Sequence, residues 1–354
     1  MARKRRKRKG YVGQTRKQNQ KTQKILINYT KEESFWFTGT KDAKLYGKIW
    51  SPNDEWEQLR KEQKESIRPR AVVHIVPGAT DHIGRYEKLA KELNEIGIVV
   101  SGLDLRHCGH NEAGGTASLQ QYGWDDTLAD IWKYSNFLDE RFQNIPRFVL
   151  GFSLGSFLVR DYFRQYEDPV DGIILIGTGT RNGLLMDYRT TIIDLQIQKY
   201  GFDTASQLTD KWTYKFNNKY FENNKSDLDW FCSDDEELQK VLLDKKCKKS
   251  VSSGLLWQTL HAIKRVNSKH TYERYNKWIP ILLMSGEKDP IGEMGIGLEK
   301  IKEKMMKCGI KNVQILGKFE NSRHDLLHEE KSGDAAIARK HIKGWILQKL
   351  NNNF

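Results

Sequence analysis

The stretch Arg147-Phe-Val-Leu-Gly-Phe-Ser-Leu-Gly-Ser156 contains the motif that decides the fold. It is a short apolar run that ends in Gly151-Phe-Ser-Leu-Gly155, which matches the pattern G-x-S-x-G. The pattern is typical of a sharp turn between a strand and a helix, because the two glycines let the chain turn tightly with the serine at the apex. A serine hydroxyl is a weak nucleophile at neutral pH and needs a base. Ser153 is therefore a candidate nucleophile, provided that a strand precedes it, a helix follows it, and an acid and then a histidine come later in the chain.

Apolar runs and amphipathic segments alternate on both sides of this motif. We expect buried strands at residues 71–76, 98–103, 148–150, 173–176, 281–284 and 313–316. Helical spacing of apolar residues predicts helices near residues 86–96, 124–138 and 335–350, and another directly after Ser153. A β-hairpin is expected over residues 35–50, and a surface helix or loop over residues 53–70. This alternation predicts an α/β fold whose mostly parallel sheet has helices on both faces.

The alternation stops between residues 177 and 278, where the sequence is polar, helical in pattern and interspersed with tryptophans. We interpret residues 177–278 as a helical cap, or lid, inserted between two strands. The core then consists of residues 31–176 and 279–354. A cap in this position lies over the carboxyl edge of the sheet, which is where open α/β sheets bind their ligands.

Residues 1–30 form a basic tail that we expect to be disordered. The chain has 59 Lys and Arg residues against 46 Asp and Glu residues, a net charge of +13. Residues 1–24 hold eleven of the basic residues and no acidic one, so the remainder is close to neutral, with 48 basic residues against 46 acidic ones. The tail is interpreted as a solvated segment, with peripheral contact to anionic lipid headgroups as the alternative. We do not expect it to bind nucleic acid.

The sequence favours a cytoplasmic protein, with a membrane-peripheral location as the alternative. No apolar segment follows the basic run, as a secretory signal would require. The four cysteines, Cys108, Cys232, Cys247 and Cys308, contain no C-x-x-C pair, so neither a zinc site nor a redox motif is indicated. The sequence indicates no oligomeric state.

Candidates for the acid and the base follow Ser153 in the chain. Asp289 comes shortly after the expected strand 281–284, and Glu287 and Glu293 are its nearest competitors. His324 comes first in the loop between the last expected strand and the terminal helix, and His328 is its rival. The order serine, acid, histidine is the one that a serine hydrolase of this fold requires.

A tetrahedral intermediate also needs two hydrogen-bond donors for its oxyanion. We expect one to be the backbone N–H of Leu154, directly after the nucleophile. The other is expected in the loop after strand 71–76, where the backbone N–H of Ala79 is our choice.

Three further patterns resemble ligand-binding motifs without meeting their requirements. Gly177-Thr-Gly-Thr-Arg-Asn-Gly183 follows a strand, but its third glycine comes one residue too late for a dinucleotide fingerprint. The histidines of His107-Cys-Gly-His110 are too close together to form a metal site unaided, and His324-x-x-x-His328-Glu329 is not the H-E-x-x-H of zinc proteases. We therefore expect no cofactor and no metal.

Taken together, these segments resemble the monoacylglycerol lipase and lysophospholipase group of α/β-hydrolases, also called serine aminopeptidase-like hydrolases, over about residues 34–350. The resemblance rests on Gly78-Ala-Thr-Asp-His-Ile-Gly-Arg-Tyr86, Gly151-Phe-Ser-Leu-Gly-Ser156, Ser285-Gly-Glu-Lys-Asp-Pro-Ile-Gly292 and Ser322-Arg-His-Asp-Leu-Leu-His-Glu329. It implies the α/β-hydrolase fold and a triad of Ser153, Asp289 and His324. The chain departs from the group at Pro77-Gly78, where the group has His-Gly, and at Asp104-Leu-Arg-His-Cys-Gly109, where the group has Asp-x-Arg-Gly-His-Gly.

The expected function is that of a serine hydrolase that cleaves carboxylic esters through an acyl-enzyme intermediate. The resemblance implies a small lipid or ester substrate, a monoacylglycerol or a lysophospholipid. One alternative is an aminopeptidase of the same fold, which would use an acidic cluster such as Asp234-Asp-Glu-Glu237 to bind a free amine. Another is a non-catalytic α/β-hydrolase scaffold that binds membrane or nucleic acid, since a fold alone does not determine a function.

Overall fold

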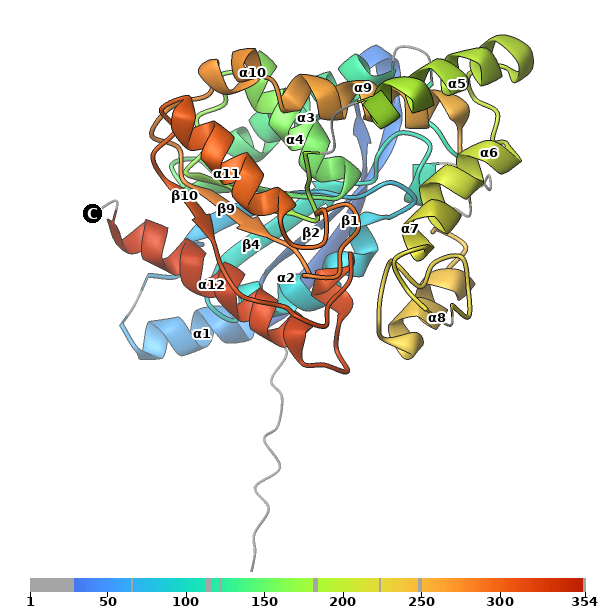
Figure 1. Cartoon of the computed structure of the whole chain (residues 1–354). Helices are drawn as coiled ribbons and strands as arrows, with labels where there is room; N and C mark the ends of the chain where they lie inside the picture. The colour runs from blue at the N-terminus through green and yellow to red at the C-terminus, as the bar shows by residue number, and fades with distance from the viewer. Residues whose placement is uncertain are drawn as a thin grey trace, which may run out of the picture.

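The fold is built on an eight-stranded sheet in which the strand order is β1-β2-β4-β3-β6-β7-β9-β10 (Figure 1). The computed structural model describes residues 29–64, 66–111, 116–120, 123–180, 184–222, 224–247 and 250–352. The strands of the large sheet are β1 (Thr30–Thr38), β2 (Lys44–Pro52), β3 (Ala71–Val76), β4 (Ile98–Leu103), β6 (Arg147–Phe152), β7 (Gly172–Ile176), β9 (Ile281–Met284) and β10 (Val313–Ile315). All pairs from β4 to β10 are parallel, whereas β1 with β2 and β2 with β4 are antiparallel. The prediction of a mostly parallel sheet is confirmed.

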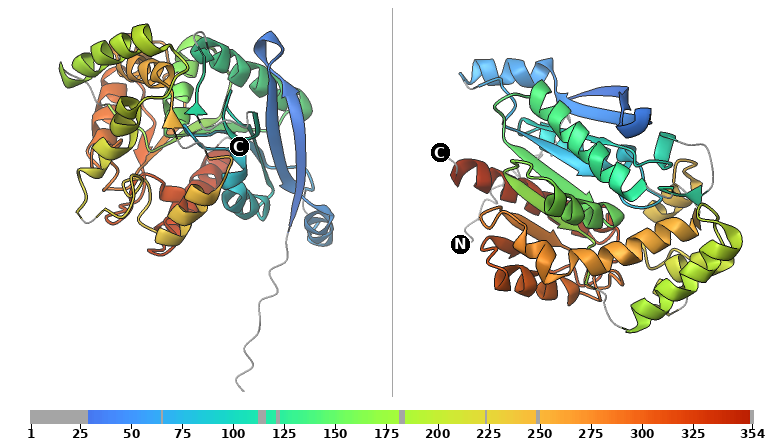
Figure 2. Two further views of the ribbon diagram at one scale, coloured as in Figure 1. Left: turned by 90° about the vertical axis from the view of Figure 1, so that its right-hand side faces the viewer. Right: turned by 90° about the horizontal axis from the view of Figure 1, so that it is seen from above.

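Helices cover both faces of this sheet, as predicted (Figures 1 and 2). On one face lie α3 (Gly123–Arg141), α4 (Leu154–Gln165) and α11 (Gly297–Lys307), and on the other lie α2 (Glu87–Asn94) and α12 (Asp334–Asn352). The central strands are mostly apolar because both of their faces are buried. In β6, for example, Val149 packs with α3 and α4 while Phe148 and Leu150 pack with α2 and α12.

The predicted hairpin is formed by β1 and β2, in which Phe35 lies opposite Gly47. A short 3-10 turn, η1 (Thr40–Asp42), joins the two strands. Residues 53–70 contain α1 (Asp54–Glu62), which begins at Asn53, where the side chain accepts the N–H of Trp56. Trp56 is buried and holds this otherwise charged helix against the core.

Residues 177–280, between β7 and β9, contribute no strand to the large sheet in the part of the chain that the structure describes. Their elements are α5 (Leu184–Tyr200), α6 (Gln207–Asp210), the π-helix η4 (Lys211–Lys215), α7 (Phe216–Asn218), α8 (Asp235–Leu243), β8 (Ser250–Val251), α9 (Ser253–Val266) and α10 (Lys269–Glu273). Strand β8 pairs with β5 (Thr116–Ala117) of the core in a second, two-stranded sheet. Apolar residues of α9 belong to the same buried cluster as those of α4, so this helix packs directly on the core.

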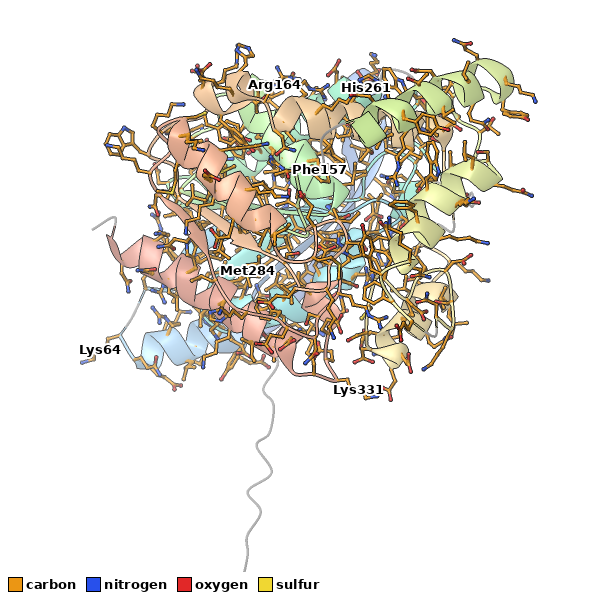
Figure 3. The ribbon with its side chains drawn as sticks, viewed as in Figure 1. Lys64, Phe157, Arg164, His261, Met284 and Lys331 are labelled. Atoms are coloured by element: carbon orange, nitrogen blue, oxygen red, sulfur yellow. The ribbon has the colours of Figure 1, made fainter. Side chains whose placement is uncertain are left out.

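Three short 3-10 helices complete the described structure, namely η2 (Ile83–Tyr86), η3 (Gly109–Asn111) and η5 (Leu326–His328). Phe157 on α4 and Met284 at the end of β9 lie in the interior, whereas Lys64 and Lys331 lie at the edge of the molecule (Figure 3). Among the described helices, none has the length and apolar character needed to cross a membrane. Almost all of the predicted basic tail, residues 1–28, lies outside the described residues.

Candidate active site

Ser153 lies at the sharp turn between β6 and α4, at the carboxyl end of the sheet. Its backbone has φ 51° and ψ −117°, a conformation that non-glycine residues rarely adopt. The Ser153 N–H donates to the carbonyl of Ile176 at the end of β7, at 2.9 Å, and so ties the turn to the neighbouring strand. Strained backbone persists only where the surroundings impose it, and here it directs a serine side chain into a cavity.

Gly155 is required because the first turn of α4 passes very close to the end of β3. A Cβ atom at this position would lie 2.0 Å from the carbonyl oxygen of Val76 and 2.5 Å from that of Pro77. We expect Gly155→Ala to destabilise the protein by about 3 kcal/mol or more, because rigid backbone must move to admit the methyl group. Urea unfolding of the purified variant measures this loss.

Gly344→Ala is the matched control for this substitution. Gly344 lies within α12, and a Cβ there meets no atom within 4 Å. Alanine at this helical position is expected to stabilise the protein by about 0.5–1 kcal/mol. A Gly155→Ala variant as stable as Gly344→Ala would contradict the close approach of α4 to β3.

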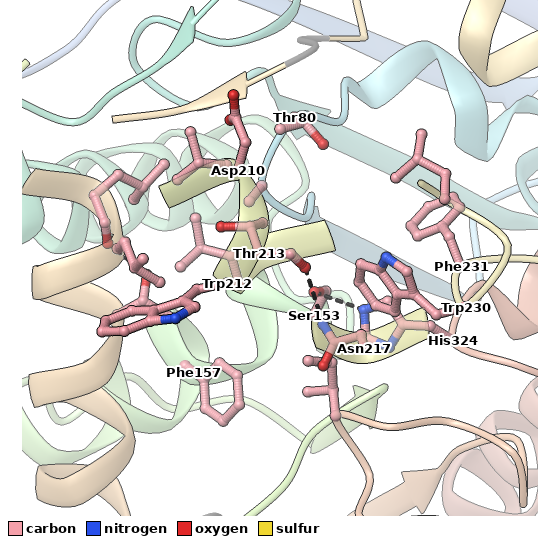
Figure 4. A pocket seen from close by; sticks show the side chains of 18 of the residues that line it. Thr80, Ser153, Phe157, Asp210, Trp212, Thr213, Asn217, Trp230, Phe231 and His324 are labelled. Carbon is pink, nitrogen blue, oxygen red and sulfur yellow. Dashed lines mark hydrogen bonds between the residues drawn. The ribbon is translucent and has the colours of Figure 1, made fainter. Parts of the chain in front are cut away.

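His324 and Asp289 form a continuous hydrogen-bonded chain with Ser153, and Figure 4 shows the part of it between His324 and Ser153. His324 Nε2 lies 2.8 Å from Ser153 Oγ, and His324 Nδ1 lies 2.9 Å from Asp289 Oδ1. His324 and Asp289 are both 0% exposed. With Nδ1–H donating to the carboxylate, Nε2 carries the lone pair that can accept the serine proton.

The Asp289 carboxylate is held in its ionised form by its neighbours. Burial raises its pKa, but His324 and two further donors outweigh this effect, and the pKa lies below its ordinary value. The hydroxyl of Ser285 donates to Oδ2 at 2.8 Å, and the N–H of Ile291 donates to Oδ1 at 2.8 Å. Ser285 was not predicted as a site residue. Its position four residues before Asp289 was the one sequence feature that could have suggested a contact with the acid.

The competing residues are engaged elsewhere. His328 Nδ1 lies 2.8 Å from Asp325 Oδ1, and its Nε2 lies 3.0 Å from the Arg85 carbonyl. Glu293 accepts the N–H of Thr180 at 2.8 Å and pairs with a lysine of α11. Among the described contacts, neither residue reaches Ser153 or His324.

Ala79 and Leu154 lie beside the Ser153 side chain, at the same cavity wall. Leu154 is the first residue of α4, and the first N–H groups of a helix have no partner within it and carry the positive end of its dipole. Gly78 approaches Ser153 so closely that a Cβ there would lie 3.3 Å from the Ser153 Cβ, which brings the loop of Ala79 against Ser153. Both predicted donors therefore belong to residues that line the same cavity as Ser153.

A cavity of about 410 Å³ opens at Ser153. Ser153 lies between Trp212 on one side and Trp230 and His324 on the other (Figure 4). Most of the remaining lining is apolar and comes from α4, α8, α9 and the segment before α8: Phe157, Leu228, Phe231, Val241, Leu242, Leu255, Leu256, Leu260 and Ile263. A ligand with a long hydrocarbon part fits such a lining.

A family model described as "Serine aminopeptidase, S33" matches residues 67–331 of the chain. The chain belongs to the serine aminopeptidase S33 family. A monoacylglycerol lipase of Mycolicibacterium smegmatis is 25% identical to this S33 protein over 152 residues, which are 43% of this chain and 48% of that lipase. The chain thus spans about half the length of this curated relative.

Two solved structures show the fold of the S33 protein. A carboxyl esterase from Bacillus coagulans in complex with glycerol has a TM-score of 0.78 at 19% identity, over 90% of this chain and 99% of that chain. A soluble variant of monoglyceride lipase from Saccharomyces cerevisiae in complex with a substrate analog has a TM-score of 0.66 at 16% identity, over 92% of this chain and 97% of that chain. The predicted α/β-hydrolase fold is confirmed.

Within the described part of this S33 protein, two groups of side chains bring metal-ligand atoms within 4.8 Å of one another, namely His82 with Asp244 and Cys247, and His82 with Asp104 and His110. His82 Nδ1 accepts the N–H of Gly84 at 3.1 Å, so the ring proton lies on Nε2, which donates to Asp244 at 2.9 Å. A neutral imidazole bonded in this way has no lone pair left for an ion. These contacts join the loop after β3 to the end of α8 and do not indicate a metal centre.

Gly177, the first residue of the apparent dinucleotide motif, contacts the candidate base. Its φ is +62°, and a Cβ there would lie 2.8 Å from His324 Cε1. The glycine leaves room for the imidazole beside β7. Residues 181–183 of the same motif lie outside the described residues.

Proposed function

We propose that this protein is a serine hydrolase that cleaves carboxylic esters of lipids, a monoacylglycerol or a lysophospholipid, through an acyl-enzyme intermediate. The observation that carries the proposal is the hydrogen-bonded chain from Ser153 through His324 to Asp289 at the wall of an apolar cavity. Residues 177–278 act as the cap that supplies most of the acyl-binding surface. The names of the relative from Mycolicibacterium smegmatis and of the yeast structure support this substrate class.

In the first half of the reaction, Ser153 Oγ attacks the ester carbonyl carbon while His324 Nε2 takes the hydroxyl proton. The Asp289 carboxylate stabilises the imidazolium that forms. The backbone N–H groups of Ala79 and Leu154 bind the oxyanion of the tetrahedral intermediate. When this intermediate collapses, the C–O bond to the alcohol breaks and His324 returns the proton to the leaving oxygen.

In the second half, water takes the place of the alcohol. His324 removes a proton from the water as its oxygen attacks the acyl carbon, and a second oxyanion forms at the same N–H groups. The bond to Ser153 Oγ then breaks, His324 protonates the serine, and the carboxylic acid leaves. Every proton in the cycle passes through one imidazole nitrogen, so no cofactor is needed to balance either step.

The acidic cluster that suggested the aminopeptidase alternative does not support it, because its residues are engaged elsewhere. Asp234 accepts the N–H groups of Glu236 and Glu237 at the start of α8, and Asp235 pairs with Lys225. None of these acidic residues lines the cavity at Ser153. Within the described residues the carboxylates that do line it are Asp210 and Asp227, so an amine substrate remains one arm of the test.

Labelling with a fluorophosphonate probe followed by substrate comparison tests the proposal. We expect the probe to label the protein and monoacylglycerols to be hydrolysed at least about 100-fold faster than amino-acyl amides of matched size, because the apolar lining favours an acyl chain. Lysophospholipids of the same acyl chain are compared in parallel. Faster cleavage of the amides would support the aminopeptidase instead, and an unlabelled protein without hydrolysis would support the non-catalytic scaffold.

A further inference from the structure

Glu329 is a fully buried carboxylate close to the candidate base, and the reaction proposed above does not use it. Its Oε1 accepts the backbone N–H of Arg323 at 2.8 Å and the backbone N–H of Ser233 at 3.0 Å. Its Oε2 accepts the hydroxyl of Ser233. Three neutral donors therefore surround one buried acid.

Burying an ionised carboxylate among neutral donors is unfavourable in free energy. Among the described residues, no lysine, arginine or histidine side chain forms an ion pair with Glu329. Burial raises the pKa of Glu329 above its ordinary value despite its three donors, and the nearby Asp325 acts in the same direction. Because the energy of burying an unpaired carboxylate is unfavourable, the stability of the fold alone does not account for an acid at this position.

The two partners of Glu329 belong to segments that meet at His324. Arg323 directly precedes the imidazole residue in the loop of residues 322–331, here termed the His loop. Ser233 lies in residues 229–234, here termed the cap strip. Other hydrogen bonds also join these segments. Asp325 N–H donates to the Phe231 carbonyl at 2.7 Å, and a carboxylate oxygen of the cap strip accepts a backbone N–H of the His loop at 2.8 Å. The Arg323 guanidinium donates to two backbone carbonyls of the cap strip, and the thiol of the cap strip lies 3.8 Å from the His328 carbonyl.

Side chains of the cap strip also pack on the imidazole itself. The ring centroids of Trp230 and Phe231 lie 5.1 Å and 5.9 Å from that of His324, and Phe152 of β6 contacts it at 5.1 Å. A shift of the cap strip relative to the His loop would therefore move the imidazole away from Ser153. The Glu329 carboxylate spans the two segments and opposes such a shift.

We propose that Glu329 is a positioning residue for His324, which holds the backbone of Arg323 to the cap strip at Ser233 and thereby keeps the imidazole in line with Ser153 and Asp289. This inference rests on the catalytic roles proposed for those three residues. The function of Glu329 is to accept hydrogen bonds, not to supply charge. A glutamine can replace it, because its Oε1 can accept both N–H groups while its NH₂ donates to the Ser233 hydroxyl.

Glu329→Leu and Glu329→Gln test the inference, with Glu330→Leu as the matched control. Glu330 is the next residue in the chain, but its carboxylate pairs with Arg339 and Lys88, away from His324. Each variant is titrated with the fluorophosphonate to count active sites, and kcat and KM for a monoacylglycerol are then measured per active site. The rate of probe inactivation and the Tm are recorded as well.

We expect Glu329→Leu to lower kcat per active site by about 10- to 100-fold, with KM within about threefold, because a displaced imidazole impairs proton transfer more than binding. Inactivation by the probe should slow in parallel. Glu329→Gln should restore kcat to within about threefold of the wild type, and Glu330→Leu should change it by less than about twofold. A purely structural role would instead lower the Tm and the number of active sites while kcat per site stayed constant.

Unchanged kcat per site in Glu329→Leu, or an equal loss in Glu329→Gln, would overturn the inference. If Glu329→Leu does not fold, Ser233→Ala takes its place, since it removes only the hydroxyl partner and keeps the backbone donor. It is expected to lower kcat by about fivefold, and an unchanged kcat would overturn the inference equally. A wild-type protein that the probe does not label would contradict the proposed triad itself, which distinguishes the two failures.

Discussion

Replacing Ser153 with alanine is expected to lower kcat for ester hydrolysis on the order of 10⁴- to 10⁶-fold and to abolish labelling by the fluorophosphonate. Without Oγ the attacking atom is absent, and His324 has no serine proton to accept across the 2.8 Å hydrogen bond. The oxyanion donors and the cavity remain, so only weak catalysis by bound water can persist. Initial rates on a monoacylglycerol above and below KM provide the measurement.

Ser156→Ala is the matched control for this change, since Ser156 lies in the same turn of α4. Its hydroxyl donates only to the Ser153 carbonyl, at 2.6 Å, so its loss should reduce kcat by at most about tenfold. Both variants should unfold at a Tm close to that of the wild type. Labelling that survives Ser153→Ala would contradict the assignment of the nucleophile.

Replacing Asp289 with asparagine is expected to lower kcat by about 10⁴-fold while the protein stays folded. The carboxylate accepts Nδ1–H of His324, which leaves the lone pair on Nε2 to face Ser153. An asparagine with its oxygen at the Oδ1 position keeps the contacts to the Ile291 N–H and to His324 Nδ1–H, but it is neutral and no longer stabilises the imidazolium that forms. With its NH₂ at that position instead, the imidazole carries its proton on Nε2 and cannot act as a base. Initial rates on a monoacylglycerol, with the Tm recorded alongside, measure this loss.

Glu293→Gln tests the nearest competing acid in the same loop. Its carboxylate binds Thr180 and Lys300, so its loss should lower kcat by less than about tenfold. A kcat of Glu293→Gln as low as the one expected of Asp289→Asn, together with retained activity in Asp289→Asn, would show that Glu293 and not Asp289 is the acid. Both rates are normalised to active sites counted with the fluorophosphonate.

Local rules determine most of what the sequence predicts about this protein. The buried strands could be located because their residues are apolar on both faces, and the helices because their apolar residues recur at helical spacing. The turn at Ser153 could be located because two glycines flank it, and Gly155 lies against the carbonyl groups of Val76 and Pro77. Candidate residues at the ends of parallel strands share one edge of the sheet, so Ser153, Asp289 and His324 could be selected from their order along the chain.

Contacts between distant segments could not be predicted in this way. The sequence marks Trp230 and Phe231 as aromatic residues of an insertion, but it does not indicate that their rings pack on His324. In the sequence, Glu329 is one of two adjacent acids after His328, and nothing in the sequence indicates that Glu329 is the one buried against Ser233. Such contacts depend on how the cap packs against the core, and no local periodicity encodes that packing.

The sequence by itself determined the class of fold, the serine at its sharp turn and the order of the candidate acid and base. Those features follow from backbone sterics and from the period of the apolar pattern, which act over a few neighbouring residues. The tertiary structure alone brings His324 within hydrogen-bond distance of Ser153 and Asp289, and packs Trp230 and Phe231 on the imidazole. Hydrogen bonds and ring contacts act over a few ångströms, and they join residues such as Ser153 and His324 only after the whole sheet has formed.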